Sequence, residues 1–328
     1  MARKISFSQA LREAMIEEME QDPAVFLMGE DVGLFGGVFG VSAGMFDKFG
    51  ESRVRDTPIS EAAIVGAGLG AALVGMRPIV EIMFADFVTV AMDQIVNQAA
   101  KARYMSGGKA NVPLVMRVVN GAPGSAAAQH SQSPEGWFMN VPGLKIVIPA
   151  TPYDAKGLLK TAIRGEDPVM FFEHKMLYAL EGEVPDEDYY LPFGQAAIRR
   201  EGTDATIIAI GGTVQPAMEA AAQLAGRGLA AEVIDPRTLV PFDTAAVVES
   251  VKKTGRVVIA HEAHRRAGPG AEIAALLAEE AIGYLDAPII RVATKNVPFP
   301  YNPDLERFIL PGAADIVQAV EGVVTYRL

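Results

Sequence analysis

The stretch Asp56–Gly70 reads DTPISEAAIVGAGLG, and it places one carboxylate at the start of a long uncharged segment of small and apolar residues. After Glu61 the next charged side chain is Arg77. The small residues predict a buried helix over residues 61–74 against which another backbone can pack closely. A carboxylate on such a surface is expected to be poorly solvated, which is the setting in which an acid becomes a proton-transfer group.

Around this stretch, short apolar runs alternate with helical patterns of ten or more residues. Ser6 is the expected N-cap of a first helix that ends at Asp22-Pro23, and the Gly-rich stretch 29–44 is expected to be a functional loop. The alternation predicts an α/β fold with a doubly wound parallel sheet. The expected strands are 25–28, 79–83, 114–119, 146–148 and 169–172, and the further helices are 61–74, 87–104 and 152–164.

A chain of 328 residues is expected to form two domains. The acidic, turn-rich stretch Glu181–Pro192 interrupts the alternation and predicts a linker. The expected organisation is therefore a first domain at 1–180, a linker at 181–192 and a second doubly wound domain at 193–328. Its expected strands are 206–210, 231–234, 257–260 and 288–292, and its expected helices are 214–225, 244–251, 270–282 and 314–323.

Composition excludes several classes of partner. The net charge of −11 provides no basic excess for phosphates, which argues against nucleic acid and anionic membrane as partners. The sequence has no cysteine, which rules out disulfides and fits a cytoplasmic location. The longest uncharged run, Ala62–Met76, is shorter than the ~18–20 residues that span a bilayer. The first residues lack the apolar core of a targeting peptide.

Three short motifs are weighed and set aside. Residues 66–71 (GAGLGA) fit a dinucleotide fingerprint, but no convincing strand precedes them, so a closely packed helix is favoured. His261 and His264 are one residue short of the two-histidine zinc spacing, so incidental histidines after a strand are favoured. Ser125 and Ser131 lack a nucleophile-elbow pattern, which argues against a serine hydrolase.

Two residues remain as candidates for chemistry. His130 lies in the stretch 126–133, after a predicted strand of a parallel sheet, where ligands bind at the carboxyl ends of strands. It can donate a proton near neutral pH, or it can be a structural or surface histidine. Glu61 can be a proton-transfer group, or an acid favoured by the dipole at a helix N-terminus. Phe84, Phe87 and Tyr104 by themselves indicate core positions.

The combination of motifs is more specific than its parts. Asp56–Glu61, then Arg77-Pro78 before a strand, then Asp93-Gln94 in the next helix, resembles the beta chain of the thiamine diphosphate-dependent 2-oxo acid dehydrogenases. These form the decarboxylating component of the pyruvate, branched-chain and acetoin dehydrogenase complexes. The resemblance runs from Ser8 to about Leu310. It continues through Tyr104–Gly108, Gln129–Gln132, Pro142–Lys145, Pro152–Leu159 and Asp235–Thr238.

The resemblance implies a transketolase-like pyrimidine-binding domain followed by a transketolase carboxyl-terminal domain, and it assigns roles to residues. Thiamine diphosphate would lie between an alpha chain and this beta chain, and Glu61 would exchange a proton or a hydrogen bond with the aminopyrimidine ring, which activates the thiazolium carbon. Phe87 would pack on that ring, with Met83 and Ile59 nearby. His130 would assist later steps, including acyl transfer to a lipoyl group.

The resemblance also implies a structural potassium ion held mainly by backbone oxygens, although Gly165 stands where a common Asp is found. The matching positions are Leu114, Ala162, Ile163, Gly165 and Asp167. The superfamily holds magnesium and the diphosphate with a Gly-Asp-Gly motif, and the sequence contains none. The alpha chain is therefore expected to hold magnesium, in an alpha-two beta-two heterotetramer that docks on a dihydrolipoyl acyltransferase core.

The substrate stays open at this point. Residues 173–178 and 181–185 are closer to acetoin-type and pyruvate-type beta chains, whereas Ser133–Glu135 is similar to branched-chain members. Val90 stands where some pyruvate members have glutamine. The expected function is the beta subunit of a pyruvate-type or acetoin dehydrogenase. The alternatives are a branched-chain 2-oxo acid dehydrogenase subunit and a non-catalytic scaffold. A sugar-transferring transketolase is disfavoured, because the chain is too short to contain a fused diphosphate domain.

Overall fold

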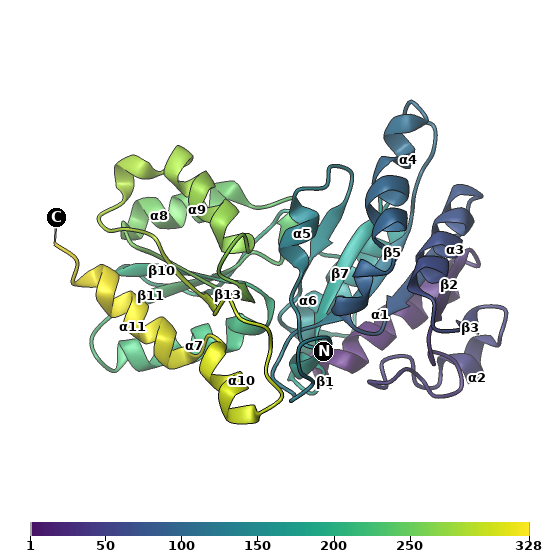
Figure 1. The fold of residues 1–328 in the computed structure, drawn as a ribbon, viewed down its shortest axis with the longest axis horizontal. Coiled ribbons are helices and arrows are strands. Elements are labelled where there is room, and N and C mark those ends of the chain that lie inside the picture. The colour runs from purple at the N-terminus through teal and green to yellow at the C-terminus, as the bar shows by residue number, and fades with distance from the viewer. Residues whose placement is uncertain (1, 328) are drawn as a thin grey trace. The chain divides into compact units, whose positions relative to one another are not determined.

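The computed structural model describes residues 2–327 and divides into two compact units (Figure 1). Unit 1 comprises residues 2–120 and 138–193, and unit 2 comprises residues 121–137 and 194–327. The segment 121–137 thus lies in unit 2 although the chain on both sides of it lies in unit 1. The position of the domain boundary in the sequence stays a prediction.

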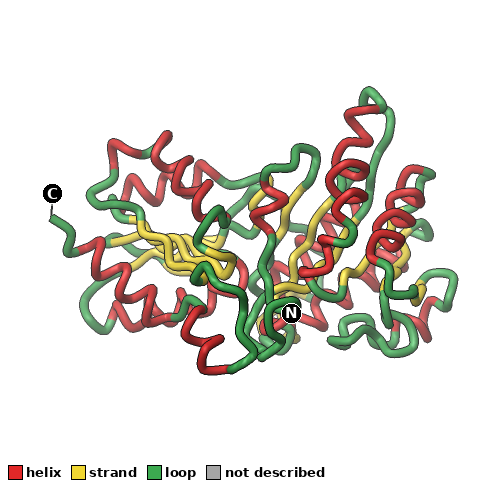
Figure 2. The backbone as a smooth tube through the Cα atoms, viewed as in Figure 1, coloured by secondary structure: helices red, strands yellow, loops and turns green. Residues whose placement is uncertain are grey.

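Unit 1 contains a parallel sheet whose strands appear in yellow in Figure 2. Each strand pairs in parallel with its neighbours, which confirms the expected fold class. The central strands are buried on both faces, as is usual for parallel sheets covered by helices. The order is β6 (Lys145–Val147), β7 (Val169–His174), β5 (Val115–Asn120), β4 (Arg77–Ile82), β2 (Val25–Gly29) and β3 (Val54–Asp56).

Helices α1 (Phe7–Gln21) and α6 (Pro152–Arg164) pack against each other. The Ser6 hydroxyl accepts a hydrogen bond from the Gln9 amide at 3.2 Å, which confirms the expected cap of α1. The helix buries its apolar stripe, as the helical spacing predicts. The buried ammonium groups of Lys156 and Lys160 in α6 bind the two oxygens of Glu17 in α1 at 2.5 and 2.6 Å.

Helix α3 (Glu61–Leu73) forms as the opening stretch predicts. The following region differs from the single helix expected over residues 87–104. It contains a 3₁₀ helix η1 (Ala85–Thr89), a π-helix η2 (Asp93–Ala99) and a short α4 (Ala100–Met105). Widened π turns are rare and tertiary packing selects them, so a 3.6-residue pattern does not distinguish them from an α-helix.

The acidic stretch expected as a linker contains a strand. Strand β8 (Glu181–Pro185) pairs antiparallel with β1 (Ala2–Ser6), with Ser6 opposite Glu181. Lys4 binds Glu181 at 3.1 Å and Arg3 binds Asp186 at 3.0 Å. Charge pairing between strands replaces the apolar alternation by which a strand is recognised in sequence.

Unit 2 contains a second sheet with helices on both faces. Figure 1 shows α7 (Val214–Ala225) and α11 (Ala313–Val324) on one face, and α8 (Thr244–Thr254) and α9 (Pro269–Glu280) on the other. All pairs are parallel except the antiparallel edge strand β9. The order is β14 (Ile290–Thr294), β13 (Val257–His264), β10 (Ala205–Ala209), β11 (Ala231–Asp235) and β9 (Ala197–Arg200).

The remaining elements of the described chain are short. They are α2 (Met45–Phe49), α5 (Glu135–Met139), η3 (Lys175–Leu177), η4 (Gly211–Thr213), β12 (Thr238–Val240), η5 (Ile282–Tyr284) and α10 (Pro303–Ile309). Within residues 2–327, none of the helices has the length and apolar character needed to cross a bilayer.

Candidate functional site

The parallel sheet of unit 1 brings several predicted site residues to one edge. Strands β3, β2 and β4 are neighbours and run in the same direction, so the residues that follow them lie at a common carboxyl edge. Ile59 and Glu61 follow β3, Glu30 follows β2, and Met83 and Phe87 follow β4. This edge is where ligands bind in open α/β sheets.

Glu61 lies in the first turn of α3 and is only 7% exposed. Among residues 2–327, its carboxylate has no hydrogen-bond or salt-bridge partner. Glu30 lies close enough to be affected by it: partial burial and the negative charges of Glu61, Asp31 and Glu81 raise the pKa of Glu30 above its usual range. A buried carboxylate without a protein partner is available to hydrogen bond with a ligand at this edge of the sheet.

The three other predicted cofactor contacts differ in exposure. Met83 and Phe87 are half-buried, whereas Ile59 is 83% exposed. Phe87 meets Phe84 edge-to-face, with ring centroids 6.2 Å apart, and Phe84 meets Phe39 in the same way at 5.7 Å. Apolar surface therefore lies at the same edge of the sheet as the buried acid.

Phe39 belongs to the Gly-rich loop over residues 29–44, which has an ordered conformation. Gly36 has φ +74°, and a Cβ there would come within 2.6 Å of the Ala43 Cα, so only glycine fits. The Asp56 carboxylate accepts a hydrogen bond from the Gly33 amide at 2.6 Å. Asp56, the first residue of the stretch Asp56–Gly70, therefore helps to fix the Gly-rich loop in position.

Sequence reasoning did not find a buried charge cluster beneath the loop. The Arg117 guanidinium lies 2.5 Å from Glu81 and makes two 2.7 Å bonds to Glu173, and the Tyr178 hydroxyl donates to Glu173 at 2.9 Å. The Tyr178 ring also packs on Phe39 at 5.5 Å. The available signal was a charged residue among apolar neighbours in each of the strands β4, β5 and β7.

The cluster holds its charges by mutual compensation. Burial raises the pKa of Glu81 above its usual range, and the Arg117 charge opposes that rise. Burial alone would lower the pKa of Arg117, but Glu173 and Glu81 raise it above its usual value. Burial and the Glu173 charge likewise raise the pKa of Tyr178. Removing Arg117 would leave the carboxylates of Glu81 and Glu173 buried without a cation.

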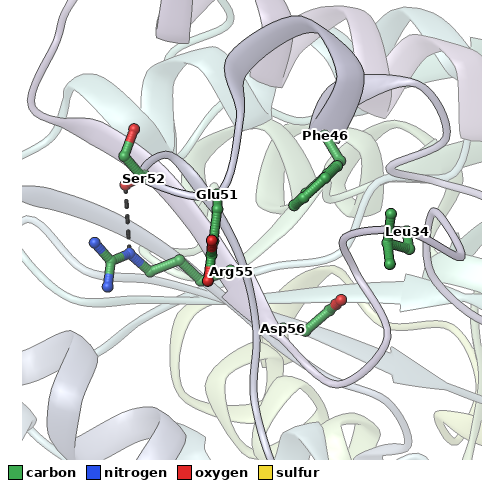
Figure 3. Close-up of a pocket in the computed structure, with 6 residues that line it drawn as sticks. All are labelled: Leu34, Phe46, Glu51, Ser52, Arg55 and Asp56. Carbon is green, nitrogen blue, oxygen red and sulfur yellow. Dashed lines mark hydrogen bonds between the residues drawn. The ribbon is translucent and has the colours of Figure 1, made fainter.

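The cavities of unit 1 flank the opening motif. Figure 3 shows one of about 620 Å³ lined by β3 and the Gly-rich loop, in which the Arg55 Nε donates to the Ser52 carbonyl at 3.3 Å. It is lined by Leu34, Phe46, Glu51, Ser52, Arg55 and Asp56. A second, of about 450 Å³, is lined in part by Thr57, Pro58 and the α3 residues Ala67 and Ala71. Glu61 lines neither cavity. It is identified as the candidate acid by its burial and its lack of a partner.

His130 is half-buried and lies in the segment 121–137 that follows β5. This segment belongs to unit 2, whereas Glu61 belongs to unit 1. The Gly121 amide donates to the Gln132 carbonyl at 3.3 Å and closes the segment on itself. The structure thus groups Glu61 with Ile59, Met83 and Phe87, and places His130 in the other unit.

The positions expected for potassium have other partners. Arg77 donates to the carbonyls of Ile163 at 3.0 Å and of Gly165 at 2.7 Å. The Leu114 carbonyl accepts from the Val169 amide, and the Ala162 carbonyl accepts from the Gly165 amide. Asp167 is paired with Arg103 and Lys145, which lower its pKa. A potassium ion would share oxygens with these donors, and the site stays a prediction.

His261 and His264 both lie in β13 rather than after it. His261 is fully buried, and burial lowers its pKa to about 4. Within the described chain, no group of three or more His, Cys, Asp or Glu side chains is arranged to hold a metal. The neutral His261 ring is therefore best described as part of the unit 2 core.

Comparison with known proteins finds two domain matches along the chain, the first of which also includes segment 121–137. Residues 3–181 match the model of the transketolase pyrimidine binding domain, and residues 194–316 match that of the transketolase C-terminal domain. The chain superposes on a solved split gene transketolase, described as an inactive beta4 tetramer, with a TM-score of 0.82 and 25% identity, covering 98% of this chain and 99% of the other.

Three named relatives are identical to this chain at about half of the aligned positions. The beta subunit of acetoin:2,6-dichlorophenolindophenol oxidoreductase from Bacillus subtilis is 50% identical over 97% of this chain and 96% of its own length. The 2-oxoisovalerate dehydrogenase beta subunit of the same organism is 49% identical, over 93% and 94%. The pyruvate dehydrogenase E1 component beta subunit of Rhizobium meliloti is 48% identical, over 96% and 69%.

The two domain matches and these identities over nearly the whole chain lead to one conclusion. The chain belongs to the thiamine diphosphate-dependent family of transketolase-like beta subunits that includes those of acetoin, pyruvate and 2-oxoisovalerate dehydrogenases.

Proposed function

We propose that this chain is the beta subunit of a thiamine-dependent acetoin or pyruvate-type 2-oxo acid dehydrogenase. One observation carries the proposal: a buried carboxylate without a partner, Glu61, begins α3 in the pyrimidine-binding module. An aromatic ring that carries basic nitrogens would supply the hydrogen-bonding partner that this acid lacks.

The residues at the sheet edge fit such a ring. Glu61 would hydrogen bond to a ring nitrogen of the aminopyrimidine and control its proton. The half-buried faces of Phe87 and Met83 would pack on the ring, and Ile59 would cover it from the segment before α3. Thiamine diphosphate, when bound, supplies a carbon nucleophile and an electron sink. The chain supplies orientation, proton control and exclusion of water.

His130 is proposed to act in the later steps. Its imidazole would transfer a proton during acyl transfer to a lipoyl group of an acyltransferase. The half-buried position of His130 leaves its ring accessible to a substrate.

An alpha subunit is proposed to complete the site in an alpha-two beta-two heterotetramer. The sequence lacks a Gly-Asp-Gly motif for magnesium and diphosphate, and the relatives are named as beta subunits. The split transketolase of similar fold is described as inactive in its beta4 form. These three facts support a site shared between two kinds of chain.

The substrate is tested by direct assay. Relatives named for acetoin, pyruvate and 2-oxoisovalerate are 50%, 48% and 49% identical, so identity does not separate them. The assembled alpha–beta pair should be assayed with pyruvate, acetoin and branched 2-oxo acids. Preference for pyruvate or acetoin supports the proposal, preference for a branched acid supports the alternative, and no turnover with any of them favours a scaffold.

A further inference from the structure

Segment 121–137 carries His130, and the residues before it have few side chains that can hold them in place. Residues 121–128 read GAPGSAAA, and small side chains provide little contact area or hydrogen-bonding capacity. Ser125 and Ala127 nevertheless adopt positive φ angles of 52° and 61°, which cost energy and persist only where the surroundings hold them. Besides the Gly121–Gln132 hydrogen bond within the segment, groups outside it bind its backbone.

One such group is Glu262 of β13. Its Oε1 accepts a hydrogen bond from the Ala122 amide at 2.5 Å and another from the Ser133 hydroxyl at 3.4 Å. These two donors lie near opposite ends of the segment, so a single carboxylate oxygen joins both ends. The Thr294 hydroxyl of β14 donates to the Glu262 backbone carbonyl and fixes Glu262 to the neighbouring strand.

The second group is Glu306 of α10, which is 1% exposed. Its Oε2 accepts from the Gly124 amide at 3.1 Å and from the Ser125 amide at 3.0 Å. Consecutive amides that converge on one charged oxygen form stronger hydrogen bonds than neutral pairs. The Asn302 side chain caps α10 through the amides of Asp304 and Leu305 and so fixes the base of Glu306.

Apolar contacts reinforce the same arrangement. Ala122 is fully buried in a cluster with Phe299 and Ile309, which lie just before α10 and within it. The carboxylates of Glu262 and Glu306 therefore meet the segment at two points within unit 2.

We propose that Glu262 and Glu306 are positioning residues, which hold the backbone of segment 121–137 so that His130 is presented for its step in the reaction. The inference rests on the proposed function for the role of His130. The tether, meaning the hydrogen bonds that Glu262 and Glu306 accept from segment 121–137, rests on the structure. Unit 2 would then contribute to chemistry through two carboxylates that touch neither substrate nor cofactor.

Hydrogen exchange on the full chain tests the tether without any activity measurement. Glu306→Ala should raise the exchange rate of peptides that contain Gly124 and Ser125 about tenfold, because amides lose charge-assisted bonds. Glu306→Gln keeps one acceptor oxygen and should give a smaller rise, and Glu262→Gln should act at Ala122. Glu232→Gln removes another buried carboxylate of unit 2, paired with Lys253, and should leave the segment unchanged.

The tether is contradicted if the Glu306 and Glu262 variants leave the hydrogen-exchange rates of the segment unchanged. It is also contradicted if Glu232→Gln raises those rates as much as they do. If Glu306→Ala does not fold, the two Gln variants decide the question because they preserve side-chain size.

Turnover of the assembled alpha–beta pair tests the positioning role. Glu306→Gln should lower kcat severalfold with little change in KM, and the loss should disappear in a His130→Ala background. A rise in exchange with unchanged kcat overturns the positioning role. The proposed function would survive that result, since Glu61 variants test it separately.

Discussion

At the scale of single residues, Glu61 combines burial with the absence of a partner. Most buried carboxylates of unit 1 are paired, as Glu81 and Glu173 are with Arg117, and an unpaired one is costly unless a ligand satisfies it. Its position at the start of α3 offsets part of that cost through the helix dipole. Glu61 is therefore the first residue to substitute.

Glu61→Gln should lower turnover of the reconstituted alpha–beta pair by roughly 10²–10⁴-fold, the usual contribution of a positioned acid or base. The amide is nearly isosteric, so the melting temperature should stay within a few degrees. Glu183→Gln, at an exposed carboxylate of β8 in the same unit, is the matched control and should retain full turnover. Unchanged decarboxylation in Glu61→Gln would favour the scaffold alternative.

His261 makes unit 2 sensitive to acid. Burial lowers its pKa to about 4 from an ordinary value of 6.5, so the unfolded chain binds a proton that the folded chain does not bind between these pH values. Stability should be fully present above about pH 6.5 and should fall by about 3 kcal/mol as the pH drops to about 4. His261→Gln should flatten this part of a denaturant-stability profile; an unchanged slope would assign it to other groups.

At the scale of elements, strands β4, β5 and β7 are joined by the buried charges of Glu81, Arg117 and Glu173 as well as by the sheet hydrogen bonds. The same cluster supports the Gly-rich loop through Tyr178 and Phe39. It therefore connects sheet stability to the edge where the candidate cofactor contacts lie.

Arg117→Met should destabilise the chain by about 3–5 kcal/mol, because it leaves two buried carboxylates without their cation. Urea unfolding of the full chain measures the effect. Arg55→Met removes an exposed guanidinium that donates a hydrogen bond to the Ser52 carbonyl, and should change stability by less than about 0.5 kcal/mol. Similar effects of the two substitutions would contradict the importance of the cluster.

The two faces of α3 can be distinguished by the same substitution at two glycines. A Cβ at Gly68 would lie 2.7 Å from Val80 Cγ1, whereas one at Gly70 would meet nothing within 4 Å. Gly70→Ala should stabilise the chain by about 0.5–1 kcal/mol through helix propensity. Gly68→Ala should be less stable than Gly70→Ala by about 1–3 kcal/mol because of overpacking. Equal melting shifts would show that α3 moves to accommodate the methyl group.

The elements that sequence predicted well are those with strong local signals. The Ser6 cap and helical spacing defined α1, and Pro152 at the first turn defined α6. Strand β8 was missed because its partner β1 lies far away in sequence and the pair is joined by charges. Glu61 was found from its apolar surroundings, but the acceptors of the His130 segment could not be, since Glu262 and Glu306 act on backbone amides that have no sequence signature.

At the scale of the whole molecule, the chain contains a complete pyrimidine-binding module and a C-terminal domain of the transketolase type. Its sequence has no Gly-Asp-Gly motif for the diphosphate end. The expected cofactor contacts therefore involve only the ring.

Isothermal titration of the isolated chain with thiamine diphosphate and magnesium should show weak binding or none, and titration of the alpha–beta pair should show tight binding. The physical reason is that the charged diphosphate supplies much of the electrostatic binding energy and this chain has no dedicated group for it. Tight binding to the isolated chain would contradict the need for a partner.

The membership of segment 121–137 in unit 2 also sets an order of events during synthesis. Glu262 follows Ala122 by 140 residues and Glu306 follows Gly124 by 182. A chain emerging from the ribosome can pair every sheet strand of unit 1 before either carboxylate exists, because domains form from the N-terminus onward. We expect segment 121–137 to become ordered last. A nascent chain would then have Glu61 in place before His130 can be held in position.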